Sequence, residues 1–479
     1  MARETVVNRE TKLIMSTGLE VAEASVVKAD ETTYFCGRSD AGEWVFGVSG
    51  EIEGFVGSRH DASGILLCPR TAANLAALRD RLPWLRPVPL GLTVSAGFGD
   101  RLGLATPGHI GALRRVCGFE SCIAPIFAQQ SVRENARTGR VPQDVMDDAT
   151  WGVFESGWRQ PWGGDADHLK NPTDIEPFAA AGFTFFTIDP GDHVDDEAHS
   201  ATPDRVLAKL RSLPWETLED TLGDLEARYV DRVFELDTES ETIDREQLHR
   251  AAAKYGRAVA YTVTMYRQVL QRVGDANFEL EVSVDETAYA TSVVEHIYIA
   301  SELNRLGVRW VSLAPRFVGE FEKGVDYLGE LEVFEQEFAR HAAVARLLGP
   351  YKLSLHSGSD KFSIYPITAR LAAKALDGRP LVHLKTAGTS FLEALRTMAA
   401  VDPGFFREIL ELARDCYETD RATYHVSASL DRVPAQAKLT DEELVGLLDE
   451  FDAREVLHVT FGSVLTAHGH RLRESLRHA

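Results

Sequence analysis

FTFFTIDPGDHVD, residues 183–195, decides the fold class, because its first half is a short apolar run that ends abruptly in polar residues. Aromatic and β-branched residues fill this run, and such a composition is typical of a buried strand. The stretch QPWGGDADHL, residues 160–169, has the same plan and ends in Asp167 and His168. Both stretches are therefore expected to be buried strands, each followed by polar side chains.

Comparable apolar runs recur along the chain, and together with the first pair we expect eight strands. The other six are LGLTVSAG (90–97), FELEVSVDE (278–286), WVSLAPR (310–316), KLSLHSG (352–358), LVHLKTAG (381–388) and ATYHVSAS (422–429). Most are separated by amphipathic helical patterns such as SVVEHIYIASELNRLG, and strands that alternate with helices form a parallel sheet. Eight such units predict an α/β fold, a (β/α)8 barrel of the TIM type. CIAPIFAQQ (122–130) is a ninth candidate strand.

The barrel is expected to occupy residues 89–435, with a long insertion at about 191–278 that has helices of its own. Residues 1–88 are expected to form a small N-terminal subdomain, because YFCGRSDAGEWVFGVSG has two strand-like runs around a turn, as in a β-hairpin. Residues 436–479 have a helical pattern and are expected to form a C-terminal extension.

The composition excludes several classes of protein. Hydrophobic residues make up 44% of the chain and charged residues 26%, as in a soluble globular protein. The formal net charge of -22 argues against a nucleic-acid partner, which needs a basic face. No apolar run approaches the roughly 20 residues of a membrane span, and the charged N-terminal segment lacks the apolar core of a signal peptide. The scattered cysteines contain no CxxC pair and fit a reducing compartment, so we expect a cytoplasmic enzyme.

Polar side chains gather at the ends of the expected strands. The carboxyl ends of the strands form the active-site face of a (β/α)8 barrel. The residues expected on that face are Asp167, His168, Asp189, Asp192, His193, Asp285, Glu286, Arg316, His356, Ser357, His383 and Lys385.

Three of these residues, His168, His356 and His383, are placed to meet as metal ligands. Three protein ligands with open positions are typical of a catalytic site for zinc, manganese, nickel or a similar divalent ion. At a strand end the backbone can turn so that Asp167, as a proton carrier, reaches the same pocket. Glu286 is a fourth candidate ligand or a second acid/base. The alternative is that some of these histidines are simply packed, since the chain has 15 of them.

Two loops look suited to binding a polar substrate. In LHSGSDKFSIYP (355–366), small residues let the backbone approach a ligand, and Ser357 and Lys361 could bind hydroxyls or a carboxylate. An ordinary serine- and glycine-rich loop is the alternative. In HLKTAGTS (383–390), Lys385 could form a Schiff base, but with a metal nearby we expect it to bind an anionic substrate.

A dinucleotide cofactor is not expected. GFGDRLG (97–103) has Leu102 where the G-x-G-x-x-G pattern needs its last glycine, and no acidic residue ends a clear second strand about 20 residues later. NAD is therefore excluded from the predicted cofactors.

WGGDADHLK, FTFFTIDPGDHVD, LHSGSDKFSIYP and HLKTAGTS together resemble the tagaturonate epimerase family, bacterial enzymes that interconvert D-tagaturonate and D-fructuronate. The resemblance covers about residues 90–430 and implies a metal-dependent barrel enzyme of hexuronate (galacturonate) catabolism. It extends to class II aldolases, in which an Asp-His pair supplies a base and a ligand. Asp167–His168 and His356–Ser357 match that outline, whereas the motif around His383 has no counterpart there.

The chemistry implied by the resemblance is a retro-aldol epimerisation at C4. The C2 ketone does not acidify the C4 hydrogen, so cleavage and re-formation of the C3–C4 bond is the expected route, with Lewis-acid help from a metal. Asp167 is the candidate that takes and returns the C4 hydroxyl proton. The substrate carboxylate needs a cationic partner, and the candidates are Arg133, Lys170, Lys361 and Lys385.

Three other functions stay open. The same residues would serve an aldolase or lyase that releases its fragments. An NAD-dependent epimerase is disfavoured by the broken glycine pattern. A non-catalytic sugar-acid sensor is disfavoured because binding needs few titratable groups, whereas many gather here. A homo-oligomer is compatible with the sequence, which does not reveal the oligomeric state.

Overall fold

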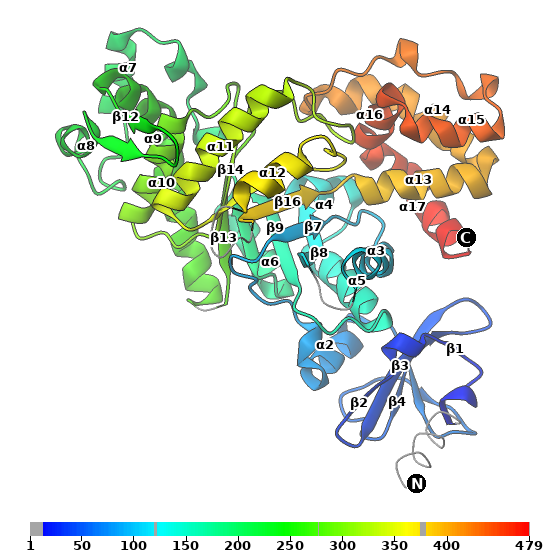
Figure 1. Ribbon diagram of the computed structural model, residues 1–479. Coiled ribbons are helices and arrows are strands. Elements are labelled where there is room, and N and C mark those ends of the chain that lie inside the picture. The colour runs from blue at the N-terminus through cyan, green and yellow to red at the C-terminus, as the bar shows by residue number, and fades with distance from the viewer. Residues whose placement is uncertain (1–12, 119–121, 276, 374–379, 479) are drawn as a thin grey trace.

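The computed structural model describes residues 13–118, 122–275, 277–373 and 380–478, and over these residues its centre is a closed barrel of eight parallel strands (Figure 1). In order around the barrel these are β7 (Ser95–Phe98), β8 (Ala124–Ser131), β9 (Gly163–Leu169), β10 (Phe185–Ile188), β13 (Glu279–Val284), β14 (Ser312–Pro315), β15 (Lys352–Leu355) and β16 (Val382–Thr386). Strand β16 pairs with β7 and closes the barrel, which confirms the predicted fold class.

The strand predictions differ from the structure at two places: the ninth candidate is a barrel strand, and one of the eight expected strands is not. CIAPIFAQQ, the ninth candidate, is β8, and its residues from Pro125 to Ser131 are all buried. ATYHVSAS was predicted to be a strand, and this prediction was wrong: after the short 3-10 helix Arg421–Thr423 the backbone is irregular. The amide groups of Ser427 and Ala428 donate to the carboxylates of Glu322 and Glu455, so side chains replace the neighbouring strand as hydrogen-bond partners.

Helices surround the barrel and bury the outer faces of its strands. Their starts follow sequence signals: Ser292 caps α10 with Glu295 in a capping box, and Asp244 caps α9 with Gln247 in the same way. The helices around the barrel are α3 (Thr106–Cys117), α4 (Val132–Thr138), α5 (Pro142–Glu155), α6 (Pro172–Ala181), α9 (Arg245–Val273), α10 (Val293–Arg305), α11 (Leu331–Leu348), α12 (Tyr365–Ala372) and α13 (Thr389–Val401).

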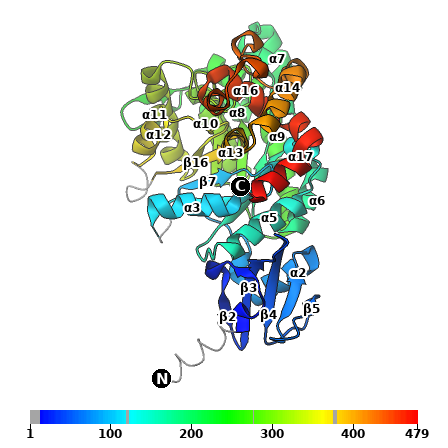
Figure 2. The ribbon, with the colours of Figure 1, turned by 90° about the vertical axis from the view of Figure 1, so that its right-hand side faces the viewer.

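The N-terminal region forms an antiparallel sheet at one end of the molecule (Figures 1 and 2). The predicted hairpin is confirmed, with Cys36 of one strand opposite Phe46 of the next. Phe46 also contacts Trp151 of α5, which attaches the sheet to the barrel. The elements are β1 (Glu20–Val21), β2 (Val27–Ala29), β3 (Thr32–Arg38), β4 (Trp44–Ser49), β5 (Ser58–Arg59), β6 (Leu66–Pro69) and α2 (Ala72–Arg81).

The chain between β10 and β13 carries its own small elements, as the insertion was expected to do. They precede the long helix α9 and comprise α7 (Pro203–Arg211), α8 (Leu222–Tyr229), β11 (Val233–Glu235) and β12 (Ser240–Thr242). Figure 1 shows them at the far side of the barrel from the C-terminal helices.

The predicted C-terminal helices are present and build a second hydrophobic cluster with α13. Those within the predicted extension are α15 (Asp441–Gly446), α16 (Phe451–Val459) and α17 (Phe461–His478). Helix α14 (Pro403–Asp420) belongs to the same cluster but precedes the expected boundary at residue 436. In the described part of the chain, none of the helices combines the length and apolar character of a membrane span. Cys117 and Cys122 form a disulfide that the sequence did not suggest, while Cys36, Cys68 and Cys416 are free.

Candidate active site

A pocket opens at the carboxyl ends of the barrel strands, where the sequence predicted the active-site face. Most of its wall comes from the barrel strands and the loops that follow them, and two residues come from the C-terminal region. The lining residues include Arg101, Gln129, Ser131, Arg133, Glu134, Asp167, His168, Asp285, Glu286, Lys323, His356, Ser357, Ser359, Lys385, Tyr424 and His458.

His168, Asp285 and His356 form a group that fits a divalent metal ion. One ligand atom from each lies within 4.8 Å of the ligand atoms of the other two. The Nδ1 atom of His356 lies 3.1 Å from Oδ1 of Asp285, and Nε2 of His168 lies 3.7 Å from the same oxygen. Two imidazole nitrogens and a carboxylate oxygen are a donor set that zinc, manganese and nickel accept.

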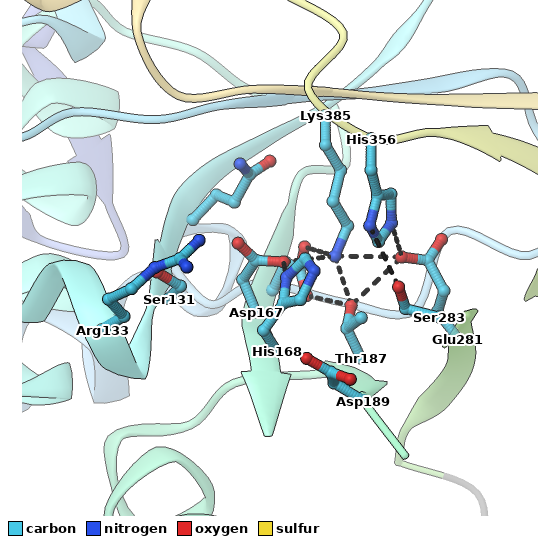
Figure 3. Close-up of polar contacts among 12 residues, drawn as sticks. Ser131, Arg133, Asp167, His168, Thr187, Asp189, Glu281, Ser283, His356 and Lys385 are labelled. Atoms are coloured by element: carbon cyan, nitrogen blue, oxygen red, sulfur yellow. Dashed lines mark hydrogen bonds and ion pairs between the residues drawn. The ribbon is translucent and has the colours of Figure 1, made fainter. Parts of the chain in front are cut away.

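In His168 and His356, the ring nitrogen that does not face Asp285 contacts another carboxylate (Figure 3). Asp167 Oδ1 lies 2.7 Å from Nδ1 of His168, and Glu281 Oε1 lies 2.8 Å from Nε2 of His356. Carboxylates in this position fix the ring and raise its basicity as a metal ligand. This second pair of carboxylates strengthens the fit of the group to a metal.

The end of β9 has an unusual backbone that brings adjacent side chains into one pocket. His168 has a φ of 54°, in the left-handed region that a residue with a side chain rarely adopts. The pairing of β9 with β10 also shifts register beside Leu169. Because of this turn, Asp167 and His168 both line the pocket, as the sequence analysis expected, although neighbours in a regular strand point in opposite directions.

Lys385 lies at the centre of a buried group of acids. Its Nζ atom lies 2.6 Å from Asp167, 2.9 Å from Asp165 and 3.0 Å from Glu281, and it also donates to Thr187 (Figure 3). Burial tends to lower the pKa of Lys385, but these three carboxylates raise it well above its usual value. The ammonium is surrounded by protein carboxylates, so this geometry does not support the predicted contact between Lys385 and a substrate anion.

The same charges shift the pKa of the other groups. Burial alone would raise the pKa of Asp167, but Lys385 and His168 together hold it well below its usual range. Burial lowers the pKa of His168, yet Asp167 and Asp285 outweigh it and raise that pKa well above the ordinary value. The pKa of His356 is likewise raised, because Asp285 and Glu281 outweigh burial. The raised pKa values mean that protons compete with a divalent ion for both imidazoles.

His383 does not join the other two histidines, contrary to the expected ligand set. Its Nδ1 atom lies 2.9 Å from Oγ of Ser95, deeper in the barrel, and its ring packs 5.2 Å from that of Phe185. Burial lowers the pKa of His383 to about 3, so the ring is neutral. The side chain sits within β16 instead of at its end, and Asp285 takes the third place in the metal-binding group.

The predicted cationic partners of a carboxylate mostly bind protein groups instead. Lys170 pairs with Asp189 at 3.3 Å and with Asp192 at 3.6 Å. The Nζ atom of Lys361 is buried and donates to three backbone carbonyls, of Glu322, Val325 and Ser359. Neither lysine lines the pocket. The geometry therefore does not support a contact of either lysine with a carboxylate in this pocket.

The rim of the pocket contains the remaining predicted residues. Arg133 pairs with Glu286 at 3.4 Å, and both side chains are partly exposed. Ser357 has a φ of 49° and accepts a hydrogen bond from Lys323. These three predicted residues therefore face the same space as the metal-binding group.

Sequence reasoning missed several residues of the site. Glu281 was hidden inside a strand, although a glutamate in the apolar run ELEVSV is itself a signal of a function in the barrel interior. Asp165 gives the same signal in β9. Arg101, Lys323 and His458 lie in loops and a C-terminal helix, and their local sequence contains no comparable signal.

Known proteins resemble this chain over nearly its whole length. A family model described as tagaturonate epimerase matches residues 22–478. The tagaturonate/fructuronate epimerase of Thermotoga maritima is 44% identical over 456 residues, covering 94% of this chain and 90% of that protein. Crystal structures of the fructuronate-tagaturonate epimerase of Cohnella laeviribosi are 34% identical. The native structure has a TM-score of 0.86 and covers 99% of this chain and 97% of its own, and a glycerol complex has a TM-score of 0.85 and covers 100% and 97%. The chain is therefore an isomerase of the tagaturonate epimerase family.

Proposed function

We propose that this enzyme interconverts D-tagaturonate and D-fructuronate at C4 by a metal-dependent retro-aldol and aldol reaction, in hexuronate catabolism. The names of its relatives support the substrate pair. The observation that carries the mechanism is one pocket in which a metal-binding group and a free carboxylate oxygen lie side by side.

In this proposal His168, Asp285 and His356 hold the metal, while Asp167 and Glu281 orient the two histidine rings. When bound, the ion supplies Lewis-acid stabilisation for the negative charge that develops at the substrate's C2 oxygen. The assignment replaces His383 by Asp285 as the third ligand. Which divalent ion is bound, among zinc, manganese and nickel, is left to experiment.

Asp167 is the proposed acid/base. Its contacts with His168 and Lys385 both use Oδ1, and no described residue forms a hydrogen bond with its Oδ2, which is left for the substrate. Asp167 is ionised, so Oδ2 can accept the C4 hydroxyl proton as the C3–C4 bond breaks and C4 becomes an aldehyde. After the aldehyde turns its other face, the bond re-forms and Asp167 returns the proton to the new C4 oxygen. No carbon-bound hydrogen moves.

The rim residues bind the substrate's polar groups in this proposal. Ser357 is placed to bind a hydroxyl, and the pair of Arg133 and Glu286 closes the outer side of the pocket. Lys385 acts by keeping Asp167 charged and in position, because all its hydrogen-bonding capacity is used within the protein.

The test is reconstitution of metal-free protein with manganese, zinc or nickel, followed by proton NMR of D-tagaturonate in D2O. We expect metal-dependent formation of D-fructuronate with little deuterium at C3 or C4. Deuterium at C4 would contradict the retro-aldol route and indicate deprotonation at that carbon. Accumulation of three-carbon fragments would indicate a lyase, and no reaction with any metal would contradict the proposed function.

Two variants test the assigned residues in the same assay. Asp167→Asn keeps the shape of the side chain but removes the base, so we expect kcat at saturating metal to fall by about 100-fold to 10,000-fold. Metal affinity should fall by about 10-fold to 100-fold, because Asp167 also orients His168. His383→Gln should retain metal binding, because His383 lies outside the metal-binding group. A loss of bound metal in His383→Gln with the protein still folded would contradict the assigned ligand set.

A further inference from the structure

The pocket wall has two cationic groups that were assigned no role above. They are Lys323, in the loop between β14 and α11, and Arg101, in the loop after β7. Lys323 has no carboxylate at ion-pair distance among the described residues, and Arg101 pairs with Glu134 but keeps one N–H group without a partner. In a chain with a net charge of -22, such unused cationic donors at a pocket wall are informative.

Lys323 is partly buried and its ammonium donates to the neutral hydroxyl of Ser357. Within the described ranges, no carboxylate oxygen comes within the 4.0 Å of an ion pair with its Nζ atom. Burial lowers the pKa of Lys323, and Glu286 only partly opposes this effect. A partly desolvated ammonium with one neutral partner is stabilised strongly by an incoming anion.

Arg101 is almost fully buried, with 4% of its surface exposed. Its Nε atom donates to Glu134 at 2.8 Å, and its Nη2 atom lies 3.3 Å from Nε2 of His458. Its Nη1 atom is buried and has no hydrogen-bond partner among the described residues. Such an unsatisfied donor is rare in a folded interior, so Nη1 is available to donate to a bound anion.

We propose that Lys323 and Arg101 form the subsite that binds the carboxylate of the sugar acid. This inference rests on the proposed function. The carboxylate at C6 belongs to the aldehyde fragment that forms when the C3–C4 bond breaks. Anchoring it at the pocket wall lets the aldehyde turn about the C4–C5 bond without leaving the pocket.

The subsite also explains why the enzyme would prefer a sugar acid to a neutral ketose. D-Tagatose has a hydroxymethyl group where D-tagaturonate has its carboxylate, so it can use the metal-binding group but not this subsite. A charge-assisted contact contributes about 1.5–3 kcal/mol, which corresponds to a factor of about 10 to 100 in kcat/KM.

The experiment compares both substrates in the wild type, Lys323→Met and Lys323→Arg, with Lys209→Met as a control. Lys209 is also a partly buried lysine, but it pairs with Asp195 and Glu197 in the insertion, outside the pocket. We expect Lys323→Met to lower kcat/KM for D-tagaturonate about 10-fold to 100-fold, mainly through KM, and to leave D-tagatose within about twofold. Lys323→Arg should recover most of the loss. No loss on D-tagaturonate, or an equal loss on both substrates, would overturn the proposal.

A binding measurement separates this inference from the proposed reaction. D-Gluconate has the carboxylate but no ketone, and D-glucitol is its neutral counterpart, so neither can undergo the reaction. By calorimetry of the metal-loaded protein, D-gluconate should bind the wild type at least about tenfold more tightly than it binds Lys323→Met or Arg101→Gln. D-Glucitol should not distinguish the proteins. Equal D-gluconate binding in all three proteins, or none to the wild type, would overturn the subsite even if epimerisation is observed.

Discussion

The positive charge of Lys385 stabilises the buried carboxylates inside the barrel. Its ammonium lies within 3.0 Å of three carboxylates, those of Asp165, Asp167 and Glu281, and all four groups are buried. Burial raises the pKa of Asp165 to about 7, although Lys385 opposes this shift. Asp165 is therefore only partly ionised at neutral pH, whereas Lys385 helps to hold the pKa values of Asp167 and Glu281 below their ordinary range.

We expect Lys385→Met to destabilise the protein by about 3–5 kcal/mol, since it leaves uncompensated carboxylates in the interior. Urea unfolding at pH 7 measures this change. Lys352→Met is the matched control, because Lys352 is also a buried barrel lysine and donates to Ser95 at 3.0 Å, but has no carboxylate within 4.0 Å among the described residues. If both variants lost the same stability, the loss would come from packing and not from the charge cluster.

At the scale of single residues, the sequence predicted the location of a side chain correctly where a residue suited to catalysis or metal binding also stands at the end of a strand. Asp167, His168 and His356 were predicted correctly to line one pocket, because they end strands. Lys170 and Lys361 lie outside that pocket, because Lys170 pairs with acids of the loop after β10 and Lys361 with backbone carbonyls. Local sequence does not reveal which of several lysines is neutralised.

Helix α16 contributes His458 to the pocket wall, although it lies many residues after the last barrel strand in the sequence. Its His458 lies against two glycines, Gly388 and Gly324, whose lack of a side chain allows the approach. A Cβ atom on Gly388 would lie 2.0 Å from Cε1 of His458, closer than any real contact. The backbone of Gly388 has a φ of -97°, which any residue can adopt. Glycine is therefore required at this position by the contact with His458 and not by the backbone conformation.

Gly388→Ala should therefore displace His458 and α16, with a loss of about 1–3 kcal/mol from overpacking and a lower kcat/KM. Thermal unfolding and initial rates measure the two effects. Gly446→Ala is the control, because a Cβ atom there meets nothing within 4 Å and the residue ends helix α15. Unchanged activity in Gly388→Ala would mean that the position of α16 does not matter to the pocket.

A buried pair of acids fastens α16 to the loop that carries Lys323. Glu455 and Glu322 share a hydrogen bond, and burial together with Glu322 raises the pKa of Glu455 to about 8. Glu322 also accepts from Ser427, and Glu455 accepts from the amide of Ala428. The pair thus joins three segments, and it needs a proton to do so.

Because the folded pKa of Glu455 is raised, the stability from this proton is complete below the ordinary pKa of 4.5 and is lost as the pH rises through about 8. Glu455→Gln donates the hydrogen bond at every pH. We expect its stability relative to the wild type to increase between pH 5 and pH 8.5, by up to about 1.4 kcal/mol for each unit of pKa shift. Unfolding curves at several pH values test this, with the exposed Glu442→Gln as control. A difference that does not change with pH would contradict the shared proton.

At the scale of elements, ATYHVSAS and CIAPIFAQQ show the limit of pattern reasoning. Both alternate or cluster apolar residues over a similar length, and only the second is a barrel strand. The two segments differ in the groups that form hydrogen bonds with their backbone. Strand β8 is bonded to β7 and β9, whereas the segment after Arg421 meets the carboxylates of Glu322 and Glu455, which belong to distant parts of the chain.

At the scale of the whole molecule, barrel closure brings together ligands that are far apart in the sequence. His168 ends β9, Asp285 follows β13 and His356 follows β15. The fold could be predicted from the sequence because it depends on repeated apolar runs. The ligand set could not be predicted completely, because His383 and Asp285 differ in their depth in the barrel, which depends on strand register.

Since the metal-binding group exists only when the barrel is closed, a bound ion should stabilise the whole fold. An ion at 100 times its Kd adds about 2.7 kcal/mol of stability, which raises Tm by a few degrees. We expect manganese, zinc or nickel to produce this rise and a chelator to reverse it. The effect should be weaker at pH 6 than at pH 8, because His168 and His356 have raised pKa values and protons compete with the metal.

His356→Ala should abolish the rise in Tm, because it removes one ligand and leaves Asp285 without its closest histidine. His425→Ala is the matched control, since the side chain of His425 is 78% exposed and contacts only Glu320 among the described ion-pair partners. If metal raised the Tm of His356→Ala as much as that of the wild type and of the control, the stabilising ion would be bound elsewhere. A rise in the wild type and the control alone would show that the stabilising ion is bound by the group that contains His356, as proposed for the reaction.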